Sequence, residues 1–118
     1  MLTTSERLLA CAQLIREGWC QDAGSGMVNG QPRRCAYIAM RDVAMLAADY
    51  MSGIGVLRHY LVQAIGRDDV VAWNDSYQQT AENVALGFEL AAILAAQEEA
   101  PPAELVDVDV LLCVGGDA

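Results

Sequence analysis

The sequence contains no lysine and a single histidine, so arginine supplies all seven of its cationic side chains. The last of them is Arg67, and the residues that follow hold eleven acidic side chains and no cation. The formal net charge is −9. A surface of this sign repels nucleic acid and attracts a basic partner. We therefore expect no direct nucleic-acid binding.

Patterns for metal, nucleotide or nucleophile chemistry are also missing. The glycine-rich stretch at 24–30 is not followed by G-K-[ST], and no two cysteines form C-x-x-C. The single His59 stands within a helical pattern, where histidine is more often a surface or partly packed residue than a catalytic one. We predict no metal and no cofactor. The cysteines are expected to be free thiols, with a Cys20–Cys35 bridge as the alternative.

No apolar run approaches the ~18 residues that a membrane-spanning helix needs. Charged residues also interrupt the N-terminal stretch, which is therefore a poor secretory signal. We expect a cytoplasmic protein that does not contact the membrane. Its 118 residues, 54% of them hydrophobic, suffice for one domain around one core.

The spacing of apolar residues predicts four principal helices. Thr3 and Glu6 form a capping-box pattern at the first, and Thr80 is a good N-cap for the last. Pro101-Pro102 forbids continuation of the last helix. The predicted fold is mainly α, a compact bundle of about four helices. The predicted ranges are 4–17, 34–50, 55–65 and 81–98.

Two segments favour strands. Asn29-Gly30 is the strongest short hairpin signal and predicts a small β-hairpin within 20–33. Alternating valines and aspartates favour a C-terminal strand at 105–114. We therefore divide the chain into a helical domain, 1–100, and an acidic C-terminal extension, 101–118.

Three segments carry a family resemblance: LIREGWCQ, RRCAYIAMRDVA and AWNDSYQQTAENVALGFELAA. Together they resemble domain of unknown function 6197, over about residues 8–97. That family occurs mainly in actinobacteria and their phages, so the resemblance implies a phage or prophage setting and no particular activity. Two positions depart from it. Arg34 stands where the family usually has tryptophan, and Gly87 interrupts a helix that the family fills with better helix formers.

Trp73-Asn74-Asp75 precedes the last predicted helix, on an expected loop, and has two interpretations. In the structural one, Trp73 packs between helices while the short polar side chains of Asn74 and Asp75 bond local amides. In the functional one, these residues border a pocket for a sugar or base. The candidate pocket residues are Trp19, Cys35, His59, Trp73, Asn74 and Asp75.

Three functions remain open. The first is a non-enzymatic binding protein, a phage or prophage accessory that engages or inhibits a host protein with a basic surface, such as a nucleic-acid-binding or defence protein. The second is a small-molecule binder or enzyme that uses the candidate pocket, and the third is a structural subunit that forms a homodimer or larger homo-oligomer. We favour the first. Its candidate partner-binding residues are Glu98, Glu99, Glu104, Asp107 and Asp109.

Overall fold

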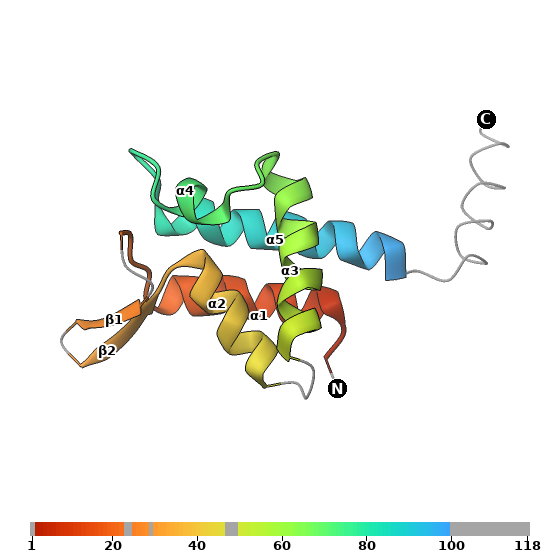
Figure 1. Cartoon of the computed structure of the whole chain (residues 1–118), viewed down its shortest axis with the longest axis horizontal. Coiled ribbons are helices and arrows are strands. Elements are labelled where there is room, and N and C mark those ends of the chain that lie inside the picture. Colours follow the sequence, from red (N-terminus) through yellow and green to blue (C-terminus); the bar gives the residue numbers. More distant parts are fainter. Residues whose placement is uncertain (1, 23–24, 29, 47–49, 100–118) are drawn as a thin grey trace, which may run out of the picture.

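A computed structural model of the chain describes residues 2–22, 25–28, 30–46 and 50–99. Within these ranges it contains five helices and one two-stranded antiparallel sheet (Figure 1). The mainly helical prediction is confirmed. In chain order the elements are α1 (Thr4–Glu17), β1 (Ser25–Val28), β2 (Gln31–Arg34), α2 (Ala36–Met45), α3 (Tyr50–Ile65), α4 (Val70–Asn74) and α5 (Ala81–Glu99).

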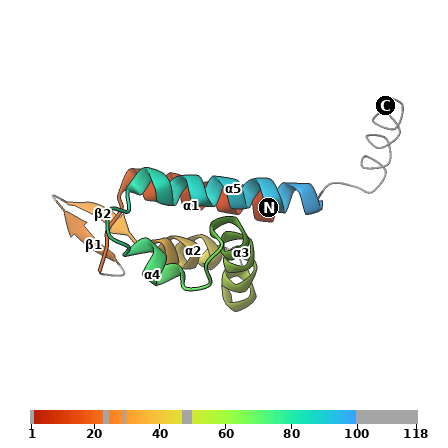
Figure 2. The ribbon, with the colours of Figure 1, turned by 90° about the horizontal axis from the view of Figure 1, so that it is seen from above.

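The helices form two layers. α1 and α5 lie side by side in one layer, and α2, α3 and α4 lie in the other (Figure 2). Contacts at both ends show that α1 and α5 are antiparallel. Arg16, near the end of α1, pairs with Glu82 and Glu89 near the start of α5, at 2.7 and 2.5 Å. At the opposite end, the Ser5 hydroxyl donates to Glu99 Oε1 at 2.8 Å.

A single hydrophobic core lies between the layers and draws residues from all five helices. Leu8, Ile15 and Phe88 are fully buried on the facing sides of α1 and α5. Met40 and Leu61 close the core from α2 and α3. Leu8 and Ile15 are seven residues apart, a spacing that places both on one side of α1, and this side faces the core.

Hydrogen bonds confirm the predicted starts of the first and the last helix. Thr3 and Glu6 form the complete capping box of α1. At α5, the Asn83 amide donates to Thr80 Oγ1 at 3.0 Å. Glu99 adds a cap to α1 from another helix, because its Oε2 accepts from the Thr4 amide at 3.1 Å. These side chains satisfy amides that have no partner within their own helix.

The hairpin prediction is also confirmed. Val28 pairs with Gln31, and Gly30 has φ +77°, the left-handed conformation that an Asn-Gly turn requires. β2 then docks on the segment that follows α1, where the Arg34 amide donates to Gly18 O at 2.9 Å. A Cβ at Gly18 would lie 2.2 Å from Pro32 O, so this close approach requires glycine.

Three segments differ from their predictions. The helix predicted over 34–50 spans only Ala36–Met45, because Arg34 belongs to β2 and Cys35 is the N-cap. The helix predicted over 55–65 begins earlier, at Tyr50. It includes Gly53, where a Cβ would lie 3.2 Å from the Cβ of Ala44 in α2, so this glycine allows α2 and α3 to approach closely.

The third segment is 70–74. These residues were predicted as a loop, but they form the short helix α4. Asp69 caps it, accepting from the Ala72 amide at 2.9 Å. The predicted strand at 105–114 and the extension at 101–118 lie outside the described residues. None of the described helices is long and apolar enough to cross a membrane.

Gly87 in α5 makes room for the Trp73 ring. A Cβ at position 87 would lie 2.8 Å from Trp73 Cη2 and 3.0 Å from its Cζ2. The ring itself packs against the hydrophobic core, so it has little space to retreat. The space that the Trp73 ring needs therefore explains why position 87 holds glycine, where the family has better helix formers.

Alanine at two helical glycines should shift stability in opposite directions. Both Gly87→Ala and Gly55→Ala gain helix propensity, about 1 kcal/mol at most. A methyl group added at position 87 would clash with Trp73. A methyl group added at position 55 would have none of the described atoms within 4 Å. We expect Gly55→Ala to raise the free energy of unfolding by about 0.5–1 kcal/mol and Gly87→Ala to lower it by about 1–2 kcal/mol. Urea denaturation measures both, and an equal gain in both variants would contradict the packing of Trp73.

Candidate functional site

Asn74, at the end of α4, is the one fully buried polar side chain among the described residues. Its Oδ1 accepts from Trp19 Nε1 at 2.8 Å and from the Ala36 amide at 3.0 Å. Its Nδ2 donates to Cys20 O at 3.1 Å and to Asp75 Oδ1 at 2.9 Å. A carboxamide offers two donors and two acceptor positions, so every position of Asn74 is used. We call these five residues, Trp19, Cys20, Ala36, Asn74 and Asp75, the Asn74 junction.

The junction joins three elements that are far apart in the sequence. Trp19 and Cys20 follow α1, Ala36 is the first residue of α2, and Asn74 ends α4. The N-cap residue of α2, Cys35, makes no side-chain capping hydrogen bond. Asn74 therefore supplies a cap to α2 from another helix, satisfying a helix-terminal amide that would otherwise be buried without a partner.

The loops around the junction are tied together in the same way. Gln21 Nε2 donates to Asn74 O at 3.1 Å and to Ser76 O at 3.0 Å. Asp75 Oδ1 also accepts from the Asp22 amide at 2.9 Å. As a result, the loop after α1 is fixed against the loop after α4.

The structural interpretation of Trp73-Asn74-Asp75 needs one correction. Trp73 does pack against the core. However, the Asn74 side chain bonds mainly to groups 38 to 55 residues away rather than to local amides. Sequence reasoning missed these partners because nothing in the local pattern around 74 indicates where residues 19 and 36 will lie.

The candidate pocket residues are only partly brought together. Trp19, Asn74 and Asp75 meet in the junction, and Cys35 adjoins it through Ala36. His59 is exposed on α3, where its Nε2 lies 2.9 Å from Gln63 Nε2. Among the described residues, the contacts of the His59 ring are with Gln63 and Tyr60, and not with the other five candidate pocket residues. Asn74 is 0% exposed and has no free polar position, so as folded the junction presents Asn74 to no ligand.

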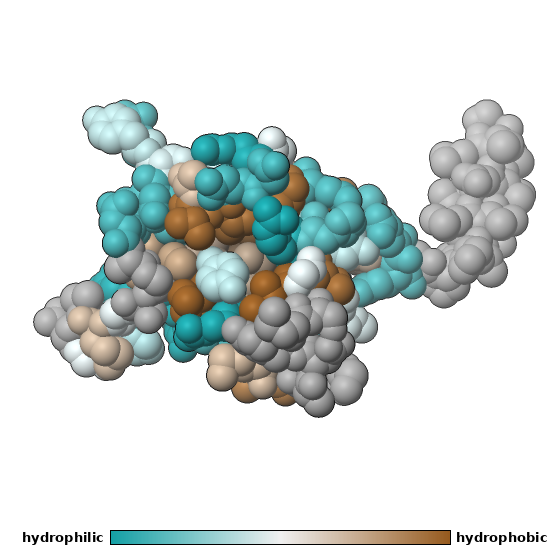
Figure 3. Space-filling model, in the orientation of Figure 1, coloured by the Kyte–Doolittle hydropathy of each residue, from teal (hydrophilic) through white to brown (hydrophobic). Residues whose placement is uncertain are grey.

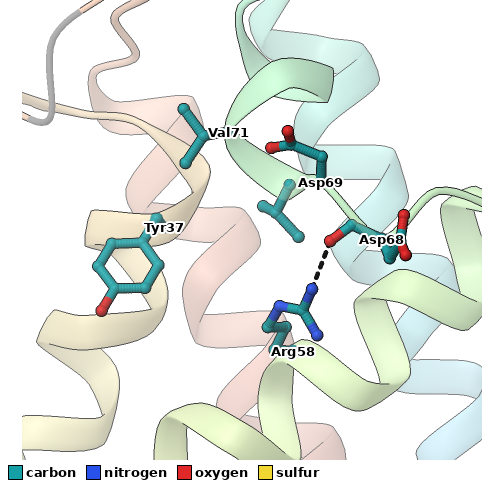
Figure 4. Close-up of a pocket in the computed structure, with 6 residues that line it drawn as sticks. Tyr37, Arg58, Asp68, Asp69 and Val71 are labelled. Carbon is teal, nitrogen blue, oxygen red and sulfur yellow. Dashed lines mark hydrogen bonds between the residues drawn. The ribbon is translucent and has the colours of Figure 1, made fainter.

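An open cavity of about 430 Å³ lies between α2, α3 and the start of α4. Figure 4 shows Tyr37 on one wall, with Arg58 and Asp68 on the other. The Arg58 guanidinium donates to the Asp68 carbonyl, and Asp69 is engaged as the cap of α4. Figure 3 shows hydrophobic residues gathered at the centre of this face. Sequence reasoning missed the cavity because its lining comes from three separate elements.

Cys11 and Cys35 are free thiols, as predicted, so the alternative Cys20–Cys35 bridge is not formed. Cys11 is buried in the core, and burial raises the pKa of its thiol. Cys20 is partly buried, and desolvation is the main cause that raises its pKa. Both shifts disfavour the reactive thiolate. Within the described ranges, no group of three or more His, Cys, Asp or Glu side chains is placed to hold a metal ion.

Two of the candidate partner-binding carboxylates make intramolecular hydrogen bonds. Glu98 Oε1 accepts from the Tyr60 hydroxyl at 2.7 Å, and this bond raises the pKa of Tyr60. Glu99 binds the N-terminus of α1. A partner would have to share or displace these bonds. Glu104, Asp107 and Asp109 lie outside the described residues.

Comparison with known proteins gives a match to one family model, described as a family of unknown function, DUF6197, over residues 1–94. The chain belongs to this family. No match was found among curated proteins or among solved structures. The Asn74 junction and all of α1 to α4 thus lie within the DUF6197 region. Arg34, which stands where the family usually has tryptophan, forms an ion pair with Asp42. Its Nε lies 2.6 Å from Asp42 Oδ2.

Removing the Asn74 side chain should be far more damaging than removing that of Asp75. Asn74→Ala leaves the Trp19 indole N–H, the Ala36 amide and the Cys20 carbonyl without their partner, and we expect a loss of about 3–4 kcal/mol in the free energy of unfolding. Asp75→Ala removes the acceptor of one Asn74 Nδ2 hydrogen and that of the exposed Asp22 amide, which water can satisfy, and should cost about 1–2 kcal/mol. Chemical denaturation of both variants provides the measurement. Equal losses would show that the junction does not have the role assigned to it.

Proposed function

We propose that this chain is a non-enzymatic binding protein that engages a basic protein surface through the outer face of α5. The observation that carries the proposal is an exposed apolar stripe on that helix. Leu86, Leu90 and Ile93 are 48%, 46% and 55% exposed. Their i, i+4, i+7 spacing places them on one side of α5, opposite the buried Phe88 and Ala95.

The neighbouring helix extends this surface. Arg16 pairs with Glu89 at one end of the antiparallel α1–α5 pair, and Ser5 bonds Glu99 at the other. This register brings Leu9 of α1, itself 49% exposed, opposite the region of Ile93. We call Leu86, Leu90 and Ile93 the α5 stripe, which Leu9 extends from α1. Contiguous exposed apolar surface of this kind marks interaction sites in soluble proteins.

The charge around the stripe favours a basic partner. Residues 68–99 contain seven acidic side chains and no cation. Two copies of a chain with net charge −9 repel each other, so this composition disfavours the homodimer. A basic partner is attracted instead, and the apolar stripe supplies the desolvated centre that a specific interface needs.

The biological setting rests on the family resemblance. In a phage or prophage, an accessory protein of this kind acts on a protein of the host. Proteins that bind nucleic acid carry basic surfaces, because they neutralise phosphates. An acidic protein that covers such a surface would inhibit its target, whether a nucleic-acid-binding or a defence protein. A small-molecule function at the candidate pocket is less well supported, because the Asn74 junction leaves its central side chain no free polar group.

Capture from an actinobacterial lysate, using matched variants, tests the proposal. The stripe variant Leu86→Ser/Leu90→Ser/Ile93→Ser should reduce the amount of captured protein by about tenfold or more. A control with equally exposed apolar residues elsewhere, Met45→Ser/Leu46→Ser/Val56→Ser, should retain them. The proteins lost should be basic, and their association rates should fall as salt rises.

Two results would contradict this proposal. The first is equal capture by the stripe variant and the control. The second is a wild-type dimer in sedimentation that the stripe variant converts to a monomer, since this would assign the stripe to self-association.

The acidic residues should divide into two groups. Glu98→Gln/Glu99→Gln weakens the bonds to Tyr60 and to the α1 N-terminus. We therefore expect the free energy of unfolding to fall by about 1 kcal/mol and the melting temperature to fall with it. Glu104→Gln/Asp107→Asn/Asp109→Asn should leave the melting temperature unchanged and slow association with the captured partner. Unchanged association rates at low and high salt would mean that these acids only confer solubility.

A further inference from the structure

A second, smaller cavity lies between the hairpin and α2. Its volume is about 250 Å³, and its lining includes Arg33 and Arg34 from β2 and Arg41 and Asp42 from α2. Met27 and Ile38 supply apolar walls. Pockets for drug-sized ligands occupy about 300–1,000 Å³, so this cavity suits a smaller molecule.

The charge of this cavity is opposite to that of the whole chain. Three of the seven arginines line it, together with one carboxylate, in a chain of net charge −9. Asp42 already serves two of them. Its Oδ2 lies 2.6 Å from Arg34 Nε and its Oδ1 lies 3.1 Å from an Arg41 guanidinium nitrogen. One carboxylate cannot neutralise three guanidinium groups, so the cavity carries an excess of positive charge.

Arg33 supplies the third guanidinium group of the cavity, with which Asp42 does not pair. Its Nε is buried and has no hydrogen-bond partner among the described residues. The Arg33 stem lies beside Gly18, since its Cγ would be 3.3 Å from a Cβ built at that glycine. β2 itself is fixed by the bond from the Arg34 amide to Gly18 O. Asp42 does not pair with this third guanidinium, so an anion in the cavity can neutralise its charge through the terminal N–H groups.

We propose that this cavity binds a small phosphate-bearing anion. A phosphate group offers several acceptor oxygens and two negative charges, which match the planar donor forks of arginine. Met27 and Ile38 would then contact a small apolar substituent. A nucleic-acid polymer is excluded from the proposal, because the remaining surface of the chain is strongly acidic.

Nuclear magnetic resonance titration of the full chain tests this site, with inorganic phosphate and glycerol phosphate as probes and glycerol and sodium chloride as controls. We expect saturable shifts at Met27 and Ile38 with a Kd on the order of 1 mM or tighter, and none with the controls. Arg33→Gln and Arg41→Gln should each weaken binding about tenfold, whereas Arg58→Gln, which changes the other cavity, should not. Arg41 is 39% exposed, so its variant tests the site even where Arg33→Gln fails to fold.

Vesicles of phosphatidylcholine with and without phosphatidic acid separate the two sources of phosphate. Binding of the soluble probes identifies a site for small anions, and additional sedimentation with phosphatidic acid vesicles would extend it to a lipid headgroup. The proposal is overturned if neither soluble probe saturates by about 10 mM, tenfold above the expected Kd. It is also overturned if Arg58→Gln weakens binding as much as Arg33→Gln does.

Discussion

The four hydrogen bonds of the buried Asn74 carboxamide fix the relative positions of α1, α2 and α4. A buried amide is tolerated only when its polar atoms are paired, so these segments must come together in one arrangement or not at all. The constraint matters most for α2, whose N-cap residue Cys35 makes no side-chain capping bond. The hairpin and both cavities depend on where α2 lies, and therefore on Asn74.

Several carboxylates of the acidic half hold the helices together. Arg16 holds Glu82 and Glu89 together, while Glu98 and Glu99 bind α3 and α1. The hydrogen bond from Arg16 lowers the pKa of Glu82. This pairing therefore stabilises the fold above the unfolded pKa of glutamate and is lost as the pH falls through the lower, folded value. Because these carboxylates make intramolecular bonds, the function proposed above assigns the specific contact to the exposed apolar residues of α5 and gives the acidic charge the role of attracting a basic partner.

Much of the fold could be predicted because its signals are local. The capping box at Thr3, the N-cap at Thr80 and the Asn29-Gly30 turn act within a few residues, and each is where the sequence placed it. α4 was missed because five residues are too few to show a helical period, although Asp69 before an apolar pair was an available signal. The junction could not be predicted, since its bonds join residues 38 to 55 positions apart and depend on the packed fold. The cavity lined by Arg33, Arg34 and Arg41 has all its residues within 26–42, but it was missed because it depends on how the hairpin packs against α2.

Hydrogen exchange at two groups tests the central role of Asn74 most directly. The Trp19 indole N–H and the Ala36 amide both donate to Asn74 Oδ1, at 2.8 and 3.0 Å. If the junction opens only when the whole domain unfolds, both hydrogens should exchange with the free energy of global unfolding, like the core amides of α1 and α5. Exchange of either hydrogen at rates typical of fraying ends or mobile loops, while the core stays protected, would contradict this account.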